Sequence, residues 1–185
     1  MALVLDKANQ IGIPSMLNQD SIHNEIKYRK VESQDIESIC AIYNSHIDLG
    51  GSTFEKEYWQ ASTLEKQIIN NQDDFWFVAQ LTDKIIGWSA ARRYSDRFGY
   101  RLTREFAIYF ATEYTGNGYA AKLLEMTERA CRLAGIHHLV SRVITNNEKS
   151  IRFHHRFGYE TVGTQREIGY LNDQWLDVAI LQKIL

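Results

Sequence analysis

The chain has 185 residues, 44% of them hydrophobic and 24% charged, which is the composition of a globular domain long enough to bury one core. Its formal charge of −2 argues against an overall basic footprint for nucleic acid. Cys40 and Cys131 stand far apart without metal-ligand spacing, so we expect no metal site, no disulfide framework and a reducing compartment. No apolar run has the length of a membrane span, and Asp6 and Lys7 interrupt the N-terminal segment, so we expect a cytoplasmic protein without a membrane partner.

Residues 1–25 show no sustained periodicity, and we interpret them as an N-terminal extension before a domain over residues 26–185. The first half of that domain predicts a strand over 26–31, a helix capped by Ser33 or Asp35, a second helix opened by capping-box spacing at 62–65, and strands over 75–79 and 85–90 in a hairpin around Thr82-Asp83. The second half predicts a strand over 105–112, a helix over 118–134, a strand over 138–144, a helix over 147–157, and strands over 159–169 and 175–184. The order βααβββαβαββ predicts an α+β, or mixed α/β, layered fold.

A glycine turn, Thr115-Gly116-Asn117-Gly118, joins the strand predicted over 105–112 to the following helix. The unpaired amides of a first helical turn point to one spot, the helix dipole attracts anions there, and glycine lets a ligand approach the backbone. The turn therefore predicts a site for phosphate or pyrophosphate, with simple chain reversal as the alternative.

Two common phosphate motifs are absent from this turn. A dinucleotide site requires GxGxxG near the start of a βαβ unit, whereas the third glycine is missing here and several predicted strands come first. A phosphate loop requires GxxxxGK[ST], which is also missing. Another carrier of pyrophosphate is needed, and coenzyme A is one.

The segment 113–120, with the sequence EYTGNGYA, resembles the acetyl-CoA signature [RQ]xxGx[GA] of the GNAT N-acetyltransferase superfamily. From about Tyr28 to the C-terminus, further segments resemble the phosphinothricin or methionine sulfoximine acetyltransferase subfamily. These segments are Ala41-Ile42-Tyr43-Asn44, Ser52-Thr53-Phe54, Arg97 with Tyr100, 103–110, 147–154, Phe157-Gly158-Tyr159 and Trp175-Leu176-Asp177-Val178. The resemblance implies the GNAT acyl-CoA N-acyltransferase fold, a twisted mixed sheet flanked by helices.

We align Thr115 with the position at which the family usually has Arg or Gln. Loss of that side chain from the phosphate-binding loop implies weaker binding of the cofactor, but not its absence. Thr115 still has a hydroxyl donor, and the backbone amides of residues 116–120 do not depend on its side chain.

The resemblance implies acetyl-CoA as the cofactor, with its pantetheine arm between two splayed strands over 105–112 and 138–145. A backbone amide within 108–110 is expected to donate a hydrogen bond to the thioester oxygen. The predicted cofactor-binding residues are Ile108, Tyr109, Phe110, Thr115, Gly116, Asn117, Gly118, Tyr119, Ala120, Asn147 and Ser150.

Two predicted catalytic residues follow from the same resemblance. Glu105 occupies the position of the family's glutamate and is predicted to be the general base, the alternative being a surface carboxylate at a strand end. His154 is predicted either to protonate the leaving thiolate or to orient coenzyme A, the alternative being a structural helix residue. His155 has no counterpart in the family.

The resemblance also implies the substrate-binding side, because Arg97 matches the arginine of the subfamily. An amino acid analogue with an anionic group needs a guanidinium to bind that group. The predicted substrate-binding residues are Arg97, Tyr100 and Phe54; unmatched neighbours are interpreted as solvated loop charges (Arg92, Arg93 and Arg101) or as packing residues (Trp88 and Tyr94).

The sequence thus predicts an acetyl-CoA-dependent N-acetyltransferase acting on a small amine, an amino acid or an analogue such as phosphinothricin or methionine sulfoximine. Direct attack in a ternary complex is expected because no cysteine matches a site position. The alternatives are acetylation of a protein N-terminus or a polyamine, and a non-catalytic acyl-CoA sensor or interaction module on the same fold. A homodimer is expected by analogy with the subfamily.

Overall fold

The computed structural model describes residues 26–185, so the extension predicted over residues 1–25 lies outside the described residues and the domain boundary stays a prediction. In chain order the elements are β1 (Ile26–Lys30), the 3-10 turn η1 (Ser33–Asp35), α2 (Ile36–Leu49), α3 (Ala61–Asn70), β2 (Phe75–Leu81), β3 (Lys84–Arg93), η2 (Phe98–Tyr100), β4 (Thr103–Phe110), η3 (Thr112–Tyr114), α4 (Tyr119–Leu133), β5 (His138–Ile144), α5 (Glu148–Arg156), β6 (Glu160–Leu171) and β7 (Gln174–Ile184). The predicted order of helices and strands is confirmed. None of the helices in residues 26–185 has both the length and the apolar character needed to span a membrane.

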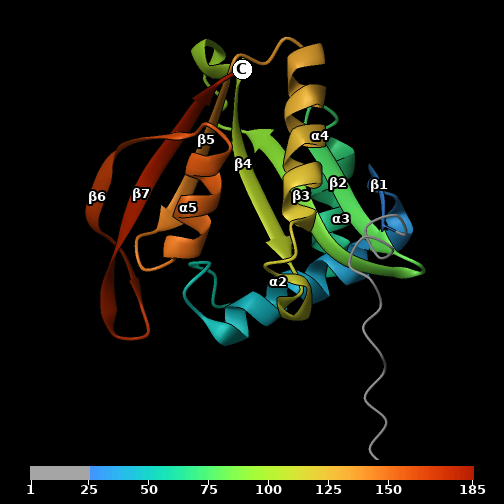
Figure 1. Cartoon of the computed structure of the whole chain (residues 1–185), viewed down its shortest axis with the longest axis horizontal. Coiled ribbons are helices and arrows are strands. Elements are labelled where there is room, and N and C mark those ends of the chain that lie inside the picture. The colour runs from blue at the N-terminus through green and yellow to red at the C-terminus, as the bar shows by residue number, and fades with distance from the viewer. Residues whose placement is uncertain (1–25) are drawn as a thin grey trace, which may run out of the picture.

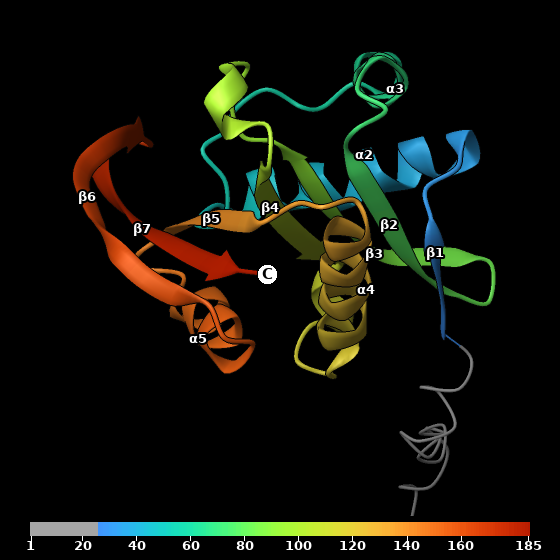
Figure 2. The same cartoon turned by 90° about the horizontal axis from the view of Figure 1, so that it is seen from above.

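The seven strands form one sheet in the order β1-β2-β3-β4-β5-β7-β6 (Figure 1). Helices α2 and α3 lie on one face of this sheet, and α4 and α5 lie on the other (Figure 2). Each face has its own core: Ile39 and Tyr43 of α2 pack against Trp88 on one side, whereas Leu124 and Cys131 of α4 pack against Phe106 on the other. The α+β prediction, with a mixed sheet flanked by helices, is confirmed.

Two local predictions need correction. The capping box at 62–65 is wrong, because α3 begins at Ala61, its N-cap is Gln60, and no side chain caps it. The strand predicted over 105–112 runs instead from Thr103 to Phe110. It ends early because the chain folds into the 3-10 turn η3 before the glycine turn.

The parallel contact between β4 and β5 is short. These strands pair only from Thr103↔His138 to Glu105↔Val140, and every other neighbouring pair in the sheet is antiparallel. Beyond Glu105, the β5-facing edge of β4 has no strand partner, while β5 continues along β7. The sheet therefore opens between β4 and β5, as predicted for two splayed strands.

Candidate active site

A cavity of about 1230 Å³ lies at the opening between β4 and β5. Its lining comes from both sides of the sheet: from α2 and the following loop on one side, and from the N-terminal end of α4 and the length of α5 on the other. Residues of β6 and β7 close a further wall. The opening in the sheet thus connects two half-sites that the sequence places far apart.

The glycine turn forms one end of the cavity. Gly116 and Gly118 have φ values of +81° and +82°, a left-handed backbone that only glycine adopts without strain. A Cβ added at Gly116 would meet no atom within 4 Å, so the backbone there is open to a ligand. Helix α4 begins at Tyr119, directly after the turn, and its first amides provide an anion site.

The Thr115 hydroxyl donates to the Thr112 carbonyl oxygen at 2.9 Å, so this donor holds the turn together. The assignment of Thr115 to the Arg/Gln position was an error of spacing. In [RQ]xxGx[GA] that position lies three residues before the first glycine, which is Glu113 here. The Glu113 carboxylate is exposed and pairs with the Lys84 ammonium at 3.1 Å, which neutralises an acid beside a predicted anion site.

The N-terminus of α5 forms the opposite wall. The Asn147 side-chain oxygen accepts the Ser150 amide at 3.2 Å and so caps the helix. The Asn147 NH₂ group has no hydrogen-bond partner within residues 26–185 and remains a donor for a ligand. Both Asn147 and Ser150 line the cavity, as predicted.

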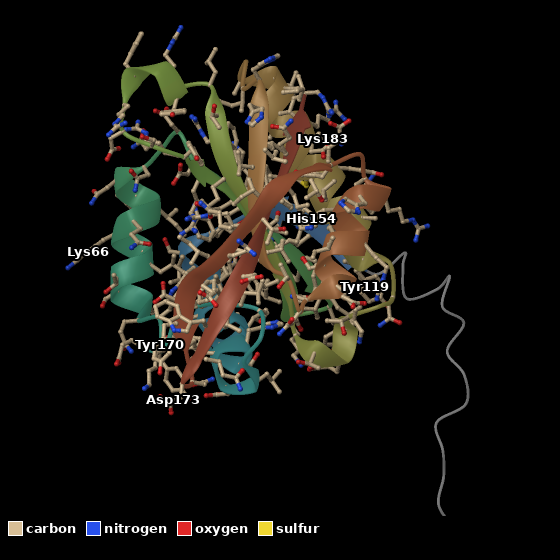
Figure 3. The ribbon with its side chains drawn as sticks, turned by 90° about the vertical axis from the view of Figure 1, so that its left-hand side faces the viewer. Lys66, Tyr119, His154, Tyr170, Asp173 and Lys183 are labelled. Carbon is tan, nitrogen blue, oxygen red and sulfur yellow. The ribbon has the colours of Figure 1, made fainter. Side chains whose placement is uncertain are left out.

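His154 lies one helical turn after Ser150 and is 3% exposed. Its Nδ1 lies 2.8 Å from the Ser150 carbonyl oxygen, and Nδ1 carries the hydrogen because a carbonyl only accepts. Burial lowers the pKa of His154. The ring is therefore neutral near pH 7, and its bare, buried Nε2 has no partner among the described residues. Figure 3 shows His154 and Tyr119 on the α4–α5 side, away from Tyr170 near the tip of the β6–β7 hairpin.

Glu105 is the last β4 residue paired with β5, so its side chain lies where the two strands part. Its two carboxylate oxygens accept hydrogen bonds from Arg142 Nε and Nη2 at 2.7 and 2.8 Å. This hydrogen bond raises the pKa of the Arg142 guanidinium. Each carboxylate oxygen keeps a lone pair for a further donor, so the pair orients Glu105 without saturating it.

An aromatic wall covers the α2 side. The Tyr43 and Trp59 rings stack with centroids 3.8 Å apart, and Trp88 stacks on Tyr109 at 5.0 Å. Asn44 fixes Trp59, because its side-chain amide donates to the Trp59 carbonyl and accepts the Trp59 backbone N–H. Tyr43 and Asn44 of the family-like segment therefore both position Trp59, Tyr43 by stacking on its ring and Asn44 by these two hydrogen bonds.

His46 ties the end of α2 to the end of β4. Its Nε2 donates to the Phe110 carbonyl oxygen at 2.8 Å, which leaves Nδ1 to accept the Ser52 hydroxyl at 3.1 Å. His46 also lines the cavity. It therefore holds the backbone at the far end of the predicted oxygen-binding segment 108–110.

Most predicted site residues come together in this cavity, and three do not. The lining includes Glu105, His154, Ile108, Tyr109, Phe110, Thr115, Gly116, Gly118, Tyr119, Ala120, Asn147, Ser150 and Phe54, but not Asn117, Arg97 or Tyr100. Arg97 and Tyr100 belong to the exposed turn around η2, where the Tyr100 ring contacts Tyr94 instead. Their role in substrate binding stays a prediction.

Sequence reasoning missed several lining residues. Arg92 was interpreted as a solvated charge and Trp88 as packing, yet both line the cavity, Trp88 while also being a core residue. Trp59, Arg142 and His46 were not singled out. The alternation along β3 and β4 was an available signal, because Arg92 shares a face with Trp88 and Glu105 shares one with Tyr109.

The arrangement fits a ligand with an extended amide-bearing arm and a pyrophosphate end. The open strand edge of β4 offers unpaired backbone groups to such an arm, and the glycine turn with the start of α4 offers amides to the pyrophosphate. A bound ligand would explain the unpartnered Nε2 of His154 and the free space at Gly116. The same cavity is lined by the Glu105 carboxylate and the aromatic wall, which could contact a second, smaller ligand.

Comparison with known proteins gives a consistent result. The family described as "Acetyltransferase (GNAT) domain" matches residues 28–180. The phosphinothricin N-acetyltransferase of Alcaligenes faecalis is 26% identical over 160 residues, covering 85% of this chain and 81% of that protein. The L-methionine sulfoximine/L-methionine sulfone acetyltransferase of Pseudomonas paraeruginosa is 26% identical, with 80% and 88% covered. The structure of a phosphinothricin acetyltransferase from Sinorhizobium meliloti in complex with acetyl-CoA superposes with a TM-score of 0.82 at 24% identity, covering 87% of this chain and 89% of that chain.

Proposed function

The chain belongs to the GNAT acetyltransferase family, and from this premise we propose that it transfers an acetyl group from acetyl-CoA to the primary amine of an amino acid or an analogue resembling phosphinothricin or methionine sulfoximine. One observation carries the proposal. Glu105 lies at the point where β4 and β5 part, in the same cavity as the glycine turn and the start of α5. A proton acceptor and a surface suited to bind acyl-CoA therefore lie together where β4 and β5, the parallel pair of the described sheet, separate.

The residues of the chain have complementary roles in this proposal, and acetyl-CoA supplies the activated acetyl group. Glu105 takes the ammonium proton of the substrate, directly or through a water, so that a neutral amine attacks. Backbone N–H groups within 108–110 stabilise the negative charge that develops on the thioester oxygen. Residues 116–120 bind the pyrophosphate through main-chain amides, and Asn147 and Ser150 hold the pantetheine arm.

His154 acts on the cofactor side. A neutral ring with hydrogen on Nδ1 presents Nε2 as an acceptor, so His154 orients a donor group of the bound cofactor instead of protonating the thiolate. The leaving thiolate takes up the proton that the attacking nitrogen loses on forming the amide, directly or through a water. Direct transfer in a ternary complex is favoured because Cys40 and Cys131 are buried and neither lines the cavity, which leaves no thiol to carry the acetyl group. The cytoplasmic location stays a prediction.

The proposal extends to a homodimer. Strand β6 is at the edge of the sheet and exposes Val162 and Ile168, while Trp175 of β7 is 61% exposed beside Tyr170. Exposed apolar residues on an edge strand are typical of protein interfaces.

Thiol release from acetyl-CoA with a panel of amines tests the proposal. Phosphinothricin and methionine sulfoximine should release free thiol in proportion to the N-acetylated product, whereas a peptide N-terminus and a polyamine should release little. Binding of coenzyme A without thiol release from any amine would identify a sensor and overturn the proposal.

A further inference from the structure

Strands β3 and β4 carry an ordered strip of side chains on the face that α2 covers. Alternate residues of a strand share a face, and paired residues of neighbouring strands lie side by side. The strip consists of three cross-strand pairs, Arg92↔Glu105, Ala90↔Ala107 and Trp88↔Tyr109. A charged pair, a pair of methyl groups and an aromatic pair thus follow one another, and all but Ala90 line the cavity.

Arg92 is the unpaired charge of this strip. Arg92 is partly buried, and both carboxylate oxygens of its neighbour Glu105 accept hydrogen bonds from Arg142. No ion pair or hydrogen bond joins the Arg92 guanidinium to another residue within residues 26–185. Arg92 and Tyr109 both line the cavity, on the same face of the β3–β4 pair. Burial raises the pKa of Tyr109, and the Arg92 cation opposes that rise. A partly buried guanidinium without a protein partner is available to bind an anion.

We propose that Arg92 is the specificity-determining residue of the site and binds the carboxylate of an α-amino acid whose amine lies beside Glu105. This inference rests on the proposed function. In an α-amino acid the amine and the carboxylate are attached to one carbon, and Arg92 and Glu105 are directly opposite each other in register. The substrate carboxylate would therefore lie beside Arg92 on β3, and the substrate amine beside Glu105 on β4.

The rest of the strip selects the substrate side chain. Ala107 lines the cavity with only a methyl group, and the wall beyond it is formed by Trp88, Tyr109, Tyr43 and Trp59. The four aromatic side chains of this wall carry no formal charge, and they fit an uncharged side chain with apolar surface. A polyamine, by contrast, would bring further positive charge to Glu105, which already lies beside Arg92 and Arg142, and the lining formed by the described residues contains only one other carboxylate, that of Glu55.

Arg93 provides a matched control on the same strand. It is the next residue, points to the opposite side of the strand, and forms ion pairs with Asp73 and Asp96 at 3.5 and 3.4 Å. Substituting either arginine by Gln removes the same charge. Only Arg92→Gln changes the cavity.

The test compares L-methionine sulfone with its carboxamide, which keeps the amine and loses the negative charge. Binding is followed in the presence of coenzyme A by the fluorescence of the cavity tryptophans Trp59 and Trp88, and turnover by thiol release. The wild-type and Arg93→Gln proteins should bind the acid about tenfold to a hundredfold more tightly than the carboxamide. Arg92→Gln should lose this preference by weakening only the acid, and Arg92→Lys should keep part of it.

Each outcome decides the inference. Equal binding of acid and carboxamide by the wild-type protein, or a preserved preference in a folded Arg92→Gln protein, would overturn it. Binding of the acid through Arg92 without thiol release would sustain the inference and contradict the proposed acetyl transfer. Turnover of both ligands with no effect of Arg92→Gln would support the proposed acetyl transfer and contradict the inference about Arg92.

Discussion

Glu105 is the residue on which the proposed chemistry depends. Glu105→Gln keeps the shape of the side chain and removes its capacity to accept a proton, so kcat should fall by about a hundredfold or more. The KM for acetyl-CoA should change little, because the predicted cofactor contacts come from main-chain groups and from α5. Steady-state kinetics with both substrates varied measures the two parameters.

Arg142 provides the control for this substitution, because it orients the Glu105 carboxylate by hydrogen bonds but is not itself the proposed proton acceptor. Arg142→Gln should lower kcat less than Glu105→Gln does. A Glu105→Gln enzyme with wild-type turnover at neutral pH would remove Glu105 from the role of base.

His154 makes the stability of the protein depend on pH. Because burial lowers the pKa of this side chain, the unfolded chain binds its proton more readily than the folded chain does. The stabilising contribution of the neutral ring is therefore complete above the ordinary pKa of 6.5 and is lost as the pH falls through the lower folded pKa. Between about pH 7 and pH 5, the Tm of the wild-type protein should fall more than that of His154→Gln.

The exposed neighbour His155 separates this effect from general acid sensitivity. His155→Gln should keep the wild-type dependence of Tm on pH. Parallel curves for the wild-type protein and His154→Gln would mean that the buried ring does not titrate with unfolding in this range.

At the scale of elements, most of the fold follows from local pattern. The hairpin around Thr82-Asp83, the helix after the glycine turn and the Asn147 cap were predictable because periodicity, glycine and capping residues are local signals. In the last hairpin, the Asp177 carboxylate accepts the Glu167 amide at 2.7 Å across an irregular stretch of β6. The prediction that a capping box at 62–65 begins a helix was wrong, because the same residue spacing also occurs inside a helix, here within α3.

The cavity could be predicted only in part, because it is built by contacts across the sheet. Family-like motifs located the glycine turn, Glu105 and α5. Trp59, by contrast, belongs to a loop without a motif and is held at the cavity by two hydrogen bonds from its backbone to the Asn44 side chain. Arg92 and Arg142 acquire their meaning only from the register of β3, β4 and β5 around Glu105. No local pattern encodes which charge remains unpaired.

Strand β6, which is far along the chain, contacts the predicted substrate-binding residue Phe54. A Cβ at Gly169 would lie 2.3 Å from Phe54 Cε1, so the Phe54 ring packs directly on the backbone of this strand. Gly169→Ala should displace the ring, which is 39% exposed and lines the cavity, and raise the KM for the amine by about tenfold. Stability should fall by less than about 1 kcal/mol because the ring can turn toward solvent.

Gly163 of the same strand is the matched control, since an added Cβ there meets no atom within 4 Å. Gly163→Ala should leave both the KM for the amine and the Tm unchanged. Equal effects of the two substitutions would point to a general change in β6 and not to the Phe54 contact.

For the molecule as a whole, the sheet separates the two ligands. The acetyl donor is expected on the α4–α5 side and the amine on the α2 side, with the opening beyond Glu105 as their meeting point. Arg92→Gln and Ser150→Ala act on opposite sides of this division. Their effects on kcat/KM should therefore add within about 0.5 kcal/mol, since separate sites without shared partners behave independently.

The proposed dimer is the last property of the whole molecule that the surface predicts. Val162 and Trp175 are 60% and 61% exposed at the β6–β7 edge, and neither lines the cavity. Sedimentation equilibrium should give twice the chain mass of 21.5 kDa, and a Val162→Lys/Trp175→Ser protein should sediment as a monomer. Leu133, 80% exposed at the end of α4, is a single apolar residue outside this edge, so Leu133→Ser should leave the dimer intact. A wild-type mass of one chain at micromolar concentration would refute the dimer, and a dimer that survives the double substitution would move the interface away from this edge.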